Sequence, residues 1–348
     1  MTAYLIILLV FGLMIGALFR PIMGVICYLF IYMIYNPDMW WAVKFSPYIG
    51  RLSFFAMFFL ALGSTFHFKA LSLTPTPREW LFLLFLGTAW IISLFFGVYV
   101  HELSWVYLEK LTKTFIFIFF FVRVIHTMED YNLVAWTFII GGIFLSYQAH
   151  IIGIYNEGRL DNIGGIDFSE ANSFAAFVVF CIAILGFKLL KFIWWKKLIV
   201  IPAIALLINA VILTQSRAVF IGVSIALLFV VISTSAQYRK QILFYAALAL
   251  ILLLILADVK FWQRIGTIDN EAGRIGHVKQ FNQNEQLSRI DFWKASLKIF
   301  KDHPLGIGVK NFELVVPQYD PRNPGMDAHN TYVLTYSELG IFGIAQFL

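Results

Sequence analysis

Two ionisable residues beside apolar segments have side chains that could bind an anion and move a proton. Arg217 follows a Thr-Gln-Ser turn between two apolar runs, and its guanidinium offers paired donors to a phosphate. An arginine at this depth also commonly reaches toward lipid headgroups, so that alternative stays open. His329 precedes an apolar run that opens at Thr331. A helix dipole there favours neutral imidazole, a possible general base, although a histidine at a helix start is more often a cap or a surface residue.

A second group of residues lies in the polar stretch before His329. It contains Ser288-Arg289, the turn His-Pro-Leu-Gly-Ile-Gly at 303–308, and Asn311 with Phe312. The Pro and Gly residues of the turn punctuate the chain, so we interpret the turn as structural. The segment from Arg289 to Phe300 is predicted to be an amphipathic helix on the membrane or on the protein, because apolar residues recur at helical spacing. These residues are Ile290, Trp293, Leu297 and Phe300.

Further candidate residues flank the apolar segments. Nine residues separate Asn330 from Gly340 and two separate Gly340 from Gly343, so on one helix both glycines would share a face and allow close helix packing. Arg159 and Asn172 are candidates for lining a substrate groove, with Asn330, although the loop at Arg159 also reads as simply solvated. The sequence has no His-x-x-x-His, Cys-x-x-Cys or Asp-x-Asp pattern, so we expect no metal and no cofactor.

The elements that must position these residues are membrane helices. Of the 348 residues, 60% are apolar and only 13% are charged, with a mean hydropathy of +0.80, whereas soluble domains are roughly half apolar and a quarter charged. The sequence therefore predicts an all-α polytopic membrane protein and excludes soluble enzymes and disulfide scaffolds. The net charge of +6 is attributed to topology and anionic headgroups, with no nucleic-acid partner. Cys27 and Cys181 are predicted to be buried thiols.

About 10–11 transmembrane helices are expected, since a span needs about 20 apolar residues. Residues 1–257 are predicted to form a transmembrane bundle, 258–330 a long, partly helical outer loop with the catalytic elements, and 331–348 the start of a further span. We expect the natural protein to continue beyond it. The predicted spans lie near 3–18, 22–36, 51–66, 80–99, 108–125, 131–154, 172–190, 198–214, 217–234 and 241–257, and an eleventh opens near Thr331.

The side of each connection follows from the basic residues. The connection between the seventh and eighth spans carries four lysines and no acid. The connection between the ninth and tenth spans carries Arg239-Lys240. Both connections are therefore predicted to be cytoplasmic. Alternation then places the long loop outside, together with the connections at 40–51, 101–113 and 155–170 and the turn at Arg217.

Taken in order, these motifs resemble those of the O-antigen ligase and O-antigen polymerase superfamily of bacterial envelope glycosyltransferases. The resemblance rests on the Thr-Gln-Ser-Arg turn ending at Arg217, the segment from Arg289 to Asn311, and the pattern His-Asn-x9-Gly-x2-Gly that begins at His329. It is most convincing from about Asn172 onward. The two-span opening, with Arg20-Pro21 and Asn36-Pro37, is similar to that of a ligase-like branch found beside exosortase systems.

The resemblance implies a glycan donor on a polyprenyl-diphosphate carrier and an active site on the outer face of the bacterial inner membrane. A diphosphate is already a good leaving group, so such an enzyme needs cations and a base but no metal. Matching positions imply that Arg217 and Arg289 bind the diphosphate and that His329 deprotonates the acceptor, with inversion at the anomeric carbon. The implied partners are the donor, a glycan, lipid or protein acceptor, and membrane lipids.

Several functions fit these predicted spans and candidate residues. A ligase would move the glycan to an acceptor in one step, a polymerase would extend a lipid-linked repeat unit, and a third relative would glycosylate protein Ser or Thr. A flippase or secondary transporter for lipid-linked sugars would also have many spans and an arginine at membrane depth. A transporter has no need for a long outer loop that ends in a histidine.

Overall fold

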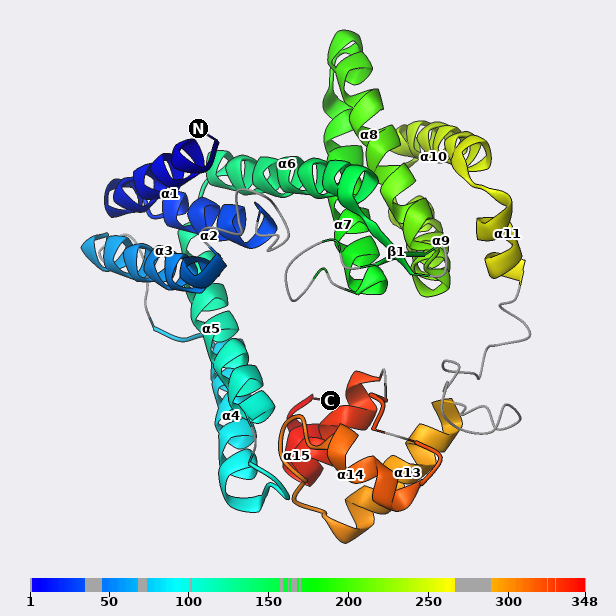
Figure 1. Ribbon diagram of the computed structural model, residues 1–348. Helices are drawn as coiled ribbons and strands as arrows, with labels where there is room; N and C mark the ends of the chain where they lie inside the picture. Colours follow the sequence, from blue (N-terminus) through cyan, green and yellow to red (C-terminus); the bar gives the residue numbers. More distant parts are fainter. Residues whose placement is uncertain are drawn as a thin grey trace. The chain divides into compact units, whose positions relative to one another are not determined.

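The computed structural model describes residues 2–34, 46–67, 74–100, 102–156, 159–161, 163, 168, 170–266, 289–323, 325–328 and 330–347, and these are almost entirely helical (Figure 1). The elements are α1 (Thr2–Phe19), α2 (Ile22–Ile34), α3 (Ser46–Phe66), α4 (Pro77–Ile91), the π-helix η1 (Ile92–Phe96), α5 (Glu102–Val124), α6 (Met128–Ile152), β1 (Ile154–Asn156), β2 (Arg159–Asp161), α7 (Ala171–Lys191), α8 (Trp194–Thr214), α9 (Arg217–Ser233), α10 (Ala236–Leu256), α11 (Val259–Gly266), α13 (Arg289–Asp302), α14 (Phe312–Tyr319) and α15 (Thr331–Phe347).

The helices confirm the predicted class of polytopic membrane protein. Within the described residues, five helices are long and apolar enough to cross a bilayer: Pro77–Phe96, Met128–Ile151, Ala171–Lys191, Trp194–Thr214 and Ala236–Leu256. Four shorter apolar helices lie at Tyr4–Phe19, Ile22–Ile34, Leu52–Phe66 and Arg217–Ser233. Each of these nine segments overlaps a predicted span, and α5 overlaps the span predicted at 108–125. Besides the helices, β1 and β2 form a short antiparallel hairpin.

The chain divides into two compact units. The first comprises residues 1–71 and 124–268, and the second comprises residues 72–123 and 269–348. The second unit thus combines α4, η1 and α5 with α13, α14 and α15. The boundaries predicted at 257 and 330 concern the membrane and its loop, and they stay a prediction.

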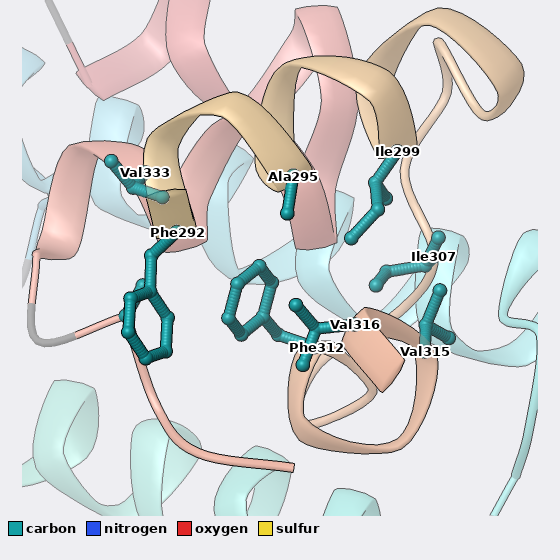
Figure 2. Close-up of a cluster of buried hydrophobic side chains, with 9 residues drawn as sticks. Phe292, Ala295, Ile299, Ile307, Phe312, Val315, Val316 and Val333 are labelled. Atoms are coloured by element: carbon teal, nitrogen blue, oxygen red, sulfur yellow. The ribbon is translucent and has the colours of Figure 1, made fainter. Parts of the chain in front are cut away.

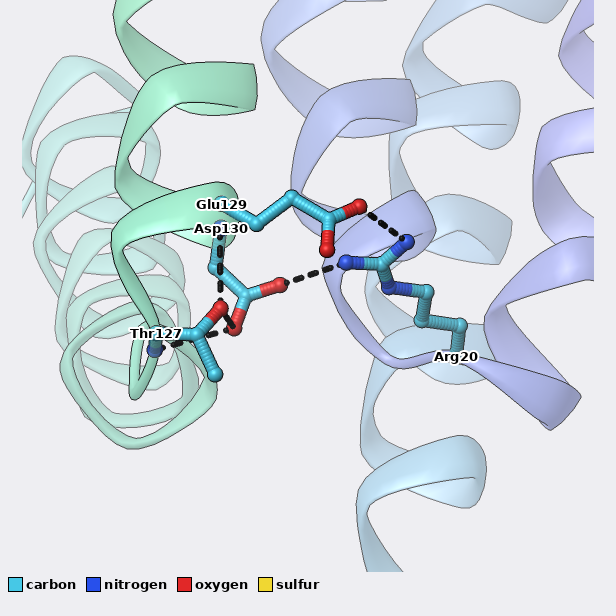
Figure 3. A network of polar contacts seen from close by, with 4 residues as sticks. All are labelled: Arg20, Thr127, Glu129 and Asp130. Carbon is cyan, nitrogen blue, oxygen red and sulfur yellow. Dashed lines mark hydrogen bonds and ion pairs between the residues drawn. The ribbon is translucent and has the colours of Figure 1, made fainter.

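In the first unit, α1, α2 and α3 pack side by side, and α6 packs on α2, α7 and α8 (Figure 1). Arg20, in the connection between α1 and α2, pairs with Glu129 and Asp130 at the start of α6, at 3.1 Å each (Figure 3). Thr127 caps α6 in a capping box with Asp130, which satisfies N–H groups that a helix start leaves without partners. Arg20 therefore fixes α6 to the α1–α2 turn on the side predicted to be cytoplasmic.

Both cysteines lie in the core of the first unit as predicted. Cys27 and Cys181 are free and buried, and their thiols contact the carbonyl oxygens of Val10 (3.6 Å) and Phe138 (3.2 Å). A close approach of α6 to α7 accompanies the second contact, because a Cβ on Gly142 would lie 2.6 Å from the Cys181 sulfur. The thiols therefore serve as small packing groups.

In the second unit, polar contacts hold α4 against α5 near both ends. The buried Arg123, at the end of α5, pairs with Glu79 at the start of α4, and its Nη2 donates to the carbonyl of Thr74 at 2.7 Å. Further along the pair, the Trp90 indole donates to the Thr112 hydroxyl at 3.1 Å. Such interhelical bonds suit helices in lipid, where the hydrophobic effect does not drive helix association.

The long loop has its own apolar core, which Figure 2 shows in close-up. In the figure, Phe292, Ala295 and Ile299 point from α13 toward Phe312 and Val316 of α14. Burying each large side chain of this kind stabilises the fold by about 1.5–3 kcal/mol. The cluster consists of Phe292, Ala295, Ile299, Ile307, Phe312, Val315, Val316, Ala328 and Val333.

The helix predicted at residues 289–300 is confirmed, and the residues that pack on the protein are not those of the predicted apolar stripe. Ile290, Trp293 and Leu297 are exposed, at 53%, 43% and 53%. The packed face is instead formed by Phe292, Ala295 and Ile299. The helix thus has two apolar faces, and the pattern alone did not reveal which one packs.

Candidate functional site

The turn from His303 to Asn311 is bonded to α15 along its backbone. Ile307 N donates to Ser337 O at 3.1 Å, and Gly308 N donates to Glu338 O at 2.9 Å. In the reverse direction, Ile341 N donates to Pro304 O at 3.0 Å. This turn, which the sequence marked by its Pro and Gly residues, therefore fixes the long loop to the helix that follows His329.

Glycine is required where this turn crosses α15. Gly306 has φ of +100° and Gly340 has φ of +63°, a region that residues with a Cβ rarely adopt. A Cβ on Gly306 would lie 2.5 Å from Glu338 O, and a Cβ on Gly340 would lie 2.3 Å from the Leu305 carbonyl carbon. The two backbones approach too closely for any side chain.

Gly340 also breaks α15. Its backbone is non-helical, so Thr331–Leu339 is one short helix and the residues after Gly340 begin another. Gly343 faces its own chain, since its Cβ would meet Leu339 and Thr335. The expectation that both glycines share one face of a continuous helix for close packing with a neighbour is therefore wrong, because the positive φ at Gly340 interrupts the helix.

The same turn is bonded to the end of α4. Val98 N donates to Ile307 O at 2.9 Å, and Val309 N donates to the Ser93 hydroxyl at 3.0 Å, within the π-helix η1. The buried Asn311 donates from Nδ2 to Tyr99 O, at 2.8 Å. π-Helical turns of this kind are frequent at functional sites. The turn of the long loop thus contacts the C-terminal end of α4. The basic residues predict that this end of α4 and the loop lie on the same side of the membrane.

A cluster of charged groups surrounds Lys310, two residues from the turn's last glycine. Its Nζ lies 2.5 Å from Glu313 and 3.9 Å from Asp327, and 4.8 Å from the centre of the Tyr107 ring. Burial acts to lower the pKa of Lys310, but the hydrogen bond to Glu313 and the nearby negative charges outweigh it and the pKa is raised. Lys310 also has a left-handed φ of +61°, a strained conformation for a residue with a side chain.

Glu338 adjoins this cluster. Its Oε1 accepts from Phe312 N at 3.3 Å, at the start of α14. Burial raises its pKa to about 7, although the Lys310 and Phe312 backbone N–H groups act to lower it. Thr331–Leu339 lies outside the five candidate spans. Burial therefore favours the neutral form of the Glu338 carboxyl group.

Sequence reasoning missed this cluster, although it lies close in sequence to His329. Lys310 and Glu313 are three residues apart at the start of a short helix, which is a weak signal for an ion pair. Tyr107 gave no signal, because it is remote in sequence and only the fold brings its ring to Lys310.

Arg217 is the first residue of α9. Gln215 before it has φ of +48°, which ends α8, and Ser216 caps α9 by accepting from Val219 N at 3.3 Å. The Ser216 hydroxyl also donates to Asn172 Oδ1 at 2.8 Å, and Asn172 Nδ2 donates to Glu170 at 3.1 Å. The structure thus brings one groove candidate, Asn172, next to the turn that carries Arg217.

The other candidates are described in part. Arg289 begins α13, and the strand residue Arg159 pairs with Asn156 across the hairpin. Asn330 Oδ1 accepts from Tyr332 N (3.0 Å) and Val333 N (3.2 Å) at the start of α15. His329, directly before it, lies outside the described residues, as do the side chains of Arg159 and Arg289. Among the residues that the structure describes, no group of three His, Cys, Asp or Glu could hold a metal ion.

The last part of the chain matches a known family. Residues 202–348 match the model of the family described as O-antigen ligase, a segment that contains Arg217, Arg289 and His329. No curated protein and no solved structure matches the chain. The match agrees with the resemblance drawn from the motifs and supports a function in glycan transfer. The chain is thus a multi-pass membrane protein in which residues 202–348 match the O-antigen ligase family.

Proposed function

We propose that the protein is a glycosyltransferase that moves a glycan from a polyprenyl-diphosphate carrier to an acceptor hydroxyl. The observation that carries the proposal is the family match at residues 202–348, which includes both arginines and the histidine. The reaction takes place on the outer face of the bacterial inner membrane, with no metal and with inversion at the anomeric carbon. The acceptor is a glycan, a lipid or a protein.

The positions of these residues along the chain support their roles. Arg217 begins α9, Arg289 begins α13, and His329 directly precedes Asn330, the capping residue of α15. Helix starts present N–H groups and a positive dipole end, which favour phosphate and oppose protonation of an imidazole. We assign the diphosphate to Arg217 and Arg289 and the acceptor proton to His329. Arg159, Asn172 and Asn330 line the substrate groove.

In the proposed reaction, His329 takes the acceptor proton as the acceptor oxygen attacks the anomeric carbon. The bond from that carbon to the diphosphate breaks, and the arginines hold the charge left on the diphosphate. General-base help of this kind is typically worth about 10² to 10⁴ in rate. His329→Ala should therefore lower transfer by about that factor and leave the fold intact.

The test uses the purified full-length protein with a labelled polyprenyl-diphosphate glycan and candidate acceptors, with products resolved by size. His303→Ala is the matched control, because His303 lies in the same loop and has no assigned role. Transfer by His329→Ala within about tenfold of the unmodified protein would overturn the role of His329. A single added glycan would indicate a ligase, a ladder of repeats a polymerase, and label on protein Ser or Thr a protein glycosyltransferase.

The arginines are tested in the same assay by Arg217→Lys and Arg289→Lys. Lysine keeps the charge but loses the paired donor geometry, so we expect weaker donor binding in both variants. Arg239→Lys, on the exposed start of α10, is the matched control. Movement of the donor across a bilayer without any transfer would instead support a transporter.

A further inference from the structure

The exposed side of α13 carries two different stripes. On one stripe, Ile290, Trp293 and Leu297 are 53%, 43% and 53% exposed. On the neighbouring stripe, Lys294, Lys298 and Lys301 are also exposed. At about 100° per residue, the two stripes lie next to each other, on the side opposite the packed residues Phe292, Ala295 and Ile299.

The lysines are not neutralised within the described part of the chain, where none of the three pairs with a carboxylate. They line a shallow hollow of about 360 Å³ with Arg322, Asp291 and Asp320. Arg322 is held by Asp320 at 2.8 Å and by Asp291 at 3.4 Å. The excess positive charge of the hollow therefore comes from the lysines.

The fold holds this helix close to the end of a membrane span. The turn that follows α13 is bonded to Ser93 and Val98, where the candidate span Pro77–Phe96 ends. Beyond Gly340, Gln346 Nε2 donates to the Thr88 hydroxyl at 2.9 Å, so the chain returns alongside the same span. α13 is thus attached through this turn to one end of a candidate span.

We propose that the exposed side of α13 binds the surface of an anionic bilayer. Trp293 and Leu297 enter the headgroup region, and Lys294, Lys298 and Lys301 bind the phosphates of anionic phospholipids. Tryptophan suits this depth because its ring is apolar and its N–H is polar. Apolar residues beside a row of lysines are typical of interfacial helices. The proposal does not depend on the proposed glycosyltransferase activity.

The test measures the depth of a spin label at Leu297→Cys on the full chain in nanodiscs. The native cysteines are buried, and the unmodified protein gives their background labelling. Discs of phosphatidylcholine with about one-third phosphatidylglycerol are compared with discs of phosphatidylcholine alone. Collision with oxygen reports lipid, and collision with a water-soluble nickel chelate reports water. Pro321→Cys, on an exposed turn of the same unit, is the matched control.

In anionic discs, we expect the label at Leu297→Cys to collide mainly with oxygen and the label at Pro321→Cys mainly with nickel. Replacing the three lysines by glutamine should lower the ratio of surface-bound to free helix on the order of 100-fold, since each lysine near an anionic surface is worth roughly fivefold. Replacing them by arginine should preserve the depth. In discs of phosphatidylcholine alone, we expect the label to lie at the same depth in the glutamine variant and in the protein with its native lysines.

Three results would overturn the proposal. A Leu297→Cys label that collides with nickel in anionic discs would place this side of α13 in water. A label shielded from both reagents would show that protein covers it. A depth that is indifferent to the glutamine substitutions would remove the role of the lysines.

Discussion

Gly306 and Gly340 lie backbone against backbone, and each has a positive φ, +100° and +63°. A Cβ on Gly306 would lie 2.8 Å from Gly340 N, and a Cβ on Gly340 would lie 2.6 Å from Gly306 N. Gly340 belongs to the family pattern that begins at His329, and Gly306 belongs to the turn of the long loop. This contact therefore sets where the helix after His329 stops and where the loop returns.

Alanine at either glycine should destabilise the second unit. Strain at a positive φ together with a backbone clash costs on the order of 3 kcal/mol, so we expect a melting temperature lower by roughly 5 to 10 °C in detergent. Gly87→Ala is the matched control, because nothing lies within 4 Å of its added Cβ. If Gly306→Ala and Gly340→Ala have the same melting temperature as the control variant, the contact between the two glycines is contradicted.

Asn311 joins the turn to the end of α4. Its buried Nδ2 donates to Tyr99 O and to Ile307 O, at 2.8 Å each. Asn311→Ala would remove both bonds. Ile307 O would keep its bond from Val98 N, whereas Tyr99 O would lose this donor, which costs on the order of 2 kcal/mol. We therefore expect a protease to cut the long loop faster in this variant. Mass spectrometry of the fragments identifies the cleavage sites and their rates. Gln318→Ala is the control, since Gln318 makes one long contact, 3.4 Å, to the Tyr99 hydroxyl.

Ser216 connects the start of α9 to Asn172. Ser216→Ala should cost about 1 kcal/mol, because it removes the helix cap as well as the bond to Asn172. Ser235→Ala is a matched control, since Ser235 precedes α10 and makes no side-chain capping bond. Thermal unfolding of Ser216→Ala, Asn172→Ala and the double variant forms a cycle, in which we expect coupling of about 0.5 kcal/mol or more. If the two single substitutions change the free energy of unfolding additively, the contact between Ser216 and Asn172 is contradicted.

Glu338 should make stability depend on pH near neutrality. Its pKa is raised to about 7 by burial, so the folded state holds its proton more tightly than the unfolded state, where the ordinary value is about 4.3. Stability therefore falls as the pH rises from about 4.5 to 7. Glu338→Gln keeps an acceptor for Phe312 N but cannot ionise.

The measurement for Glu338 is the melting temperature between pH 5 and pH 8. The difference between the unmodified protein and Glu338→Gln should grow with pH, in favour of the glutamine variant, up to about the folded pKa. Parallel curves would show that Glu338 ionises at its ordinary pKa. Glu313→Gln, at the half-buried partner of Lys310, serves for comparison.

Much of the architecture was predictable because lipid restricts what a chain can do. Each span needs a long apolar run, so nine predicted spans coincide with apolar helices. The sides assigned from the basic residues stay a prediction. The packing of α13 was not predictable, because Trp293 and Phe292 are both apolar and only the neighbouring α14 decides between them.

The sequence by itself determined the class of membrane protein and the resemblance of its motifs to the O-antigen ligase superfamily, since composition, order and spacing are properties of the chain alone. Only the tertiary structure decided that α15 breaks at Gly340, that Lys310 lies between Glu313 and the Tyr107 ring, and that Ser216 holds Asn172. The physical reason is that these features depend on contacts between residues far apart in the chain. Spacing predicts a shared helix face only while the helix continues, and at Gly340 a backbone contact with Leu305 ends it.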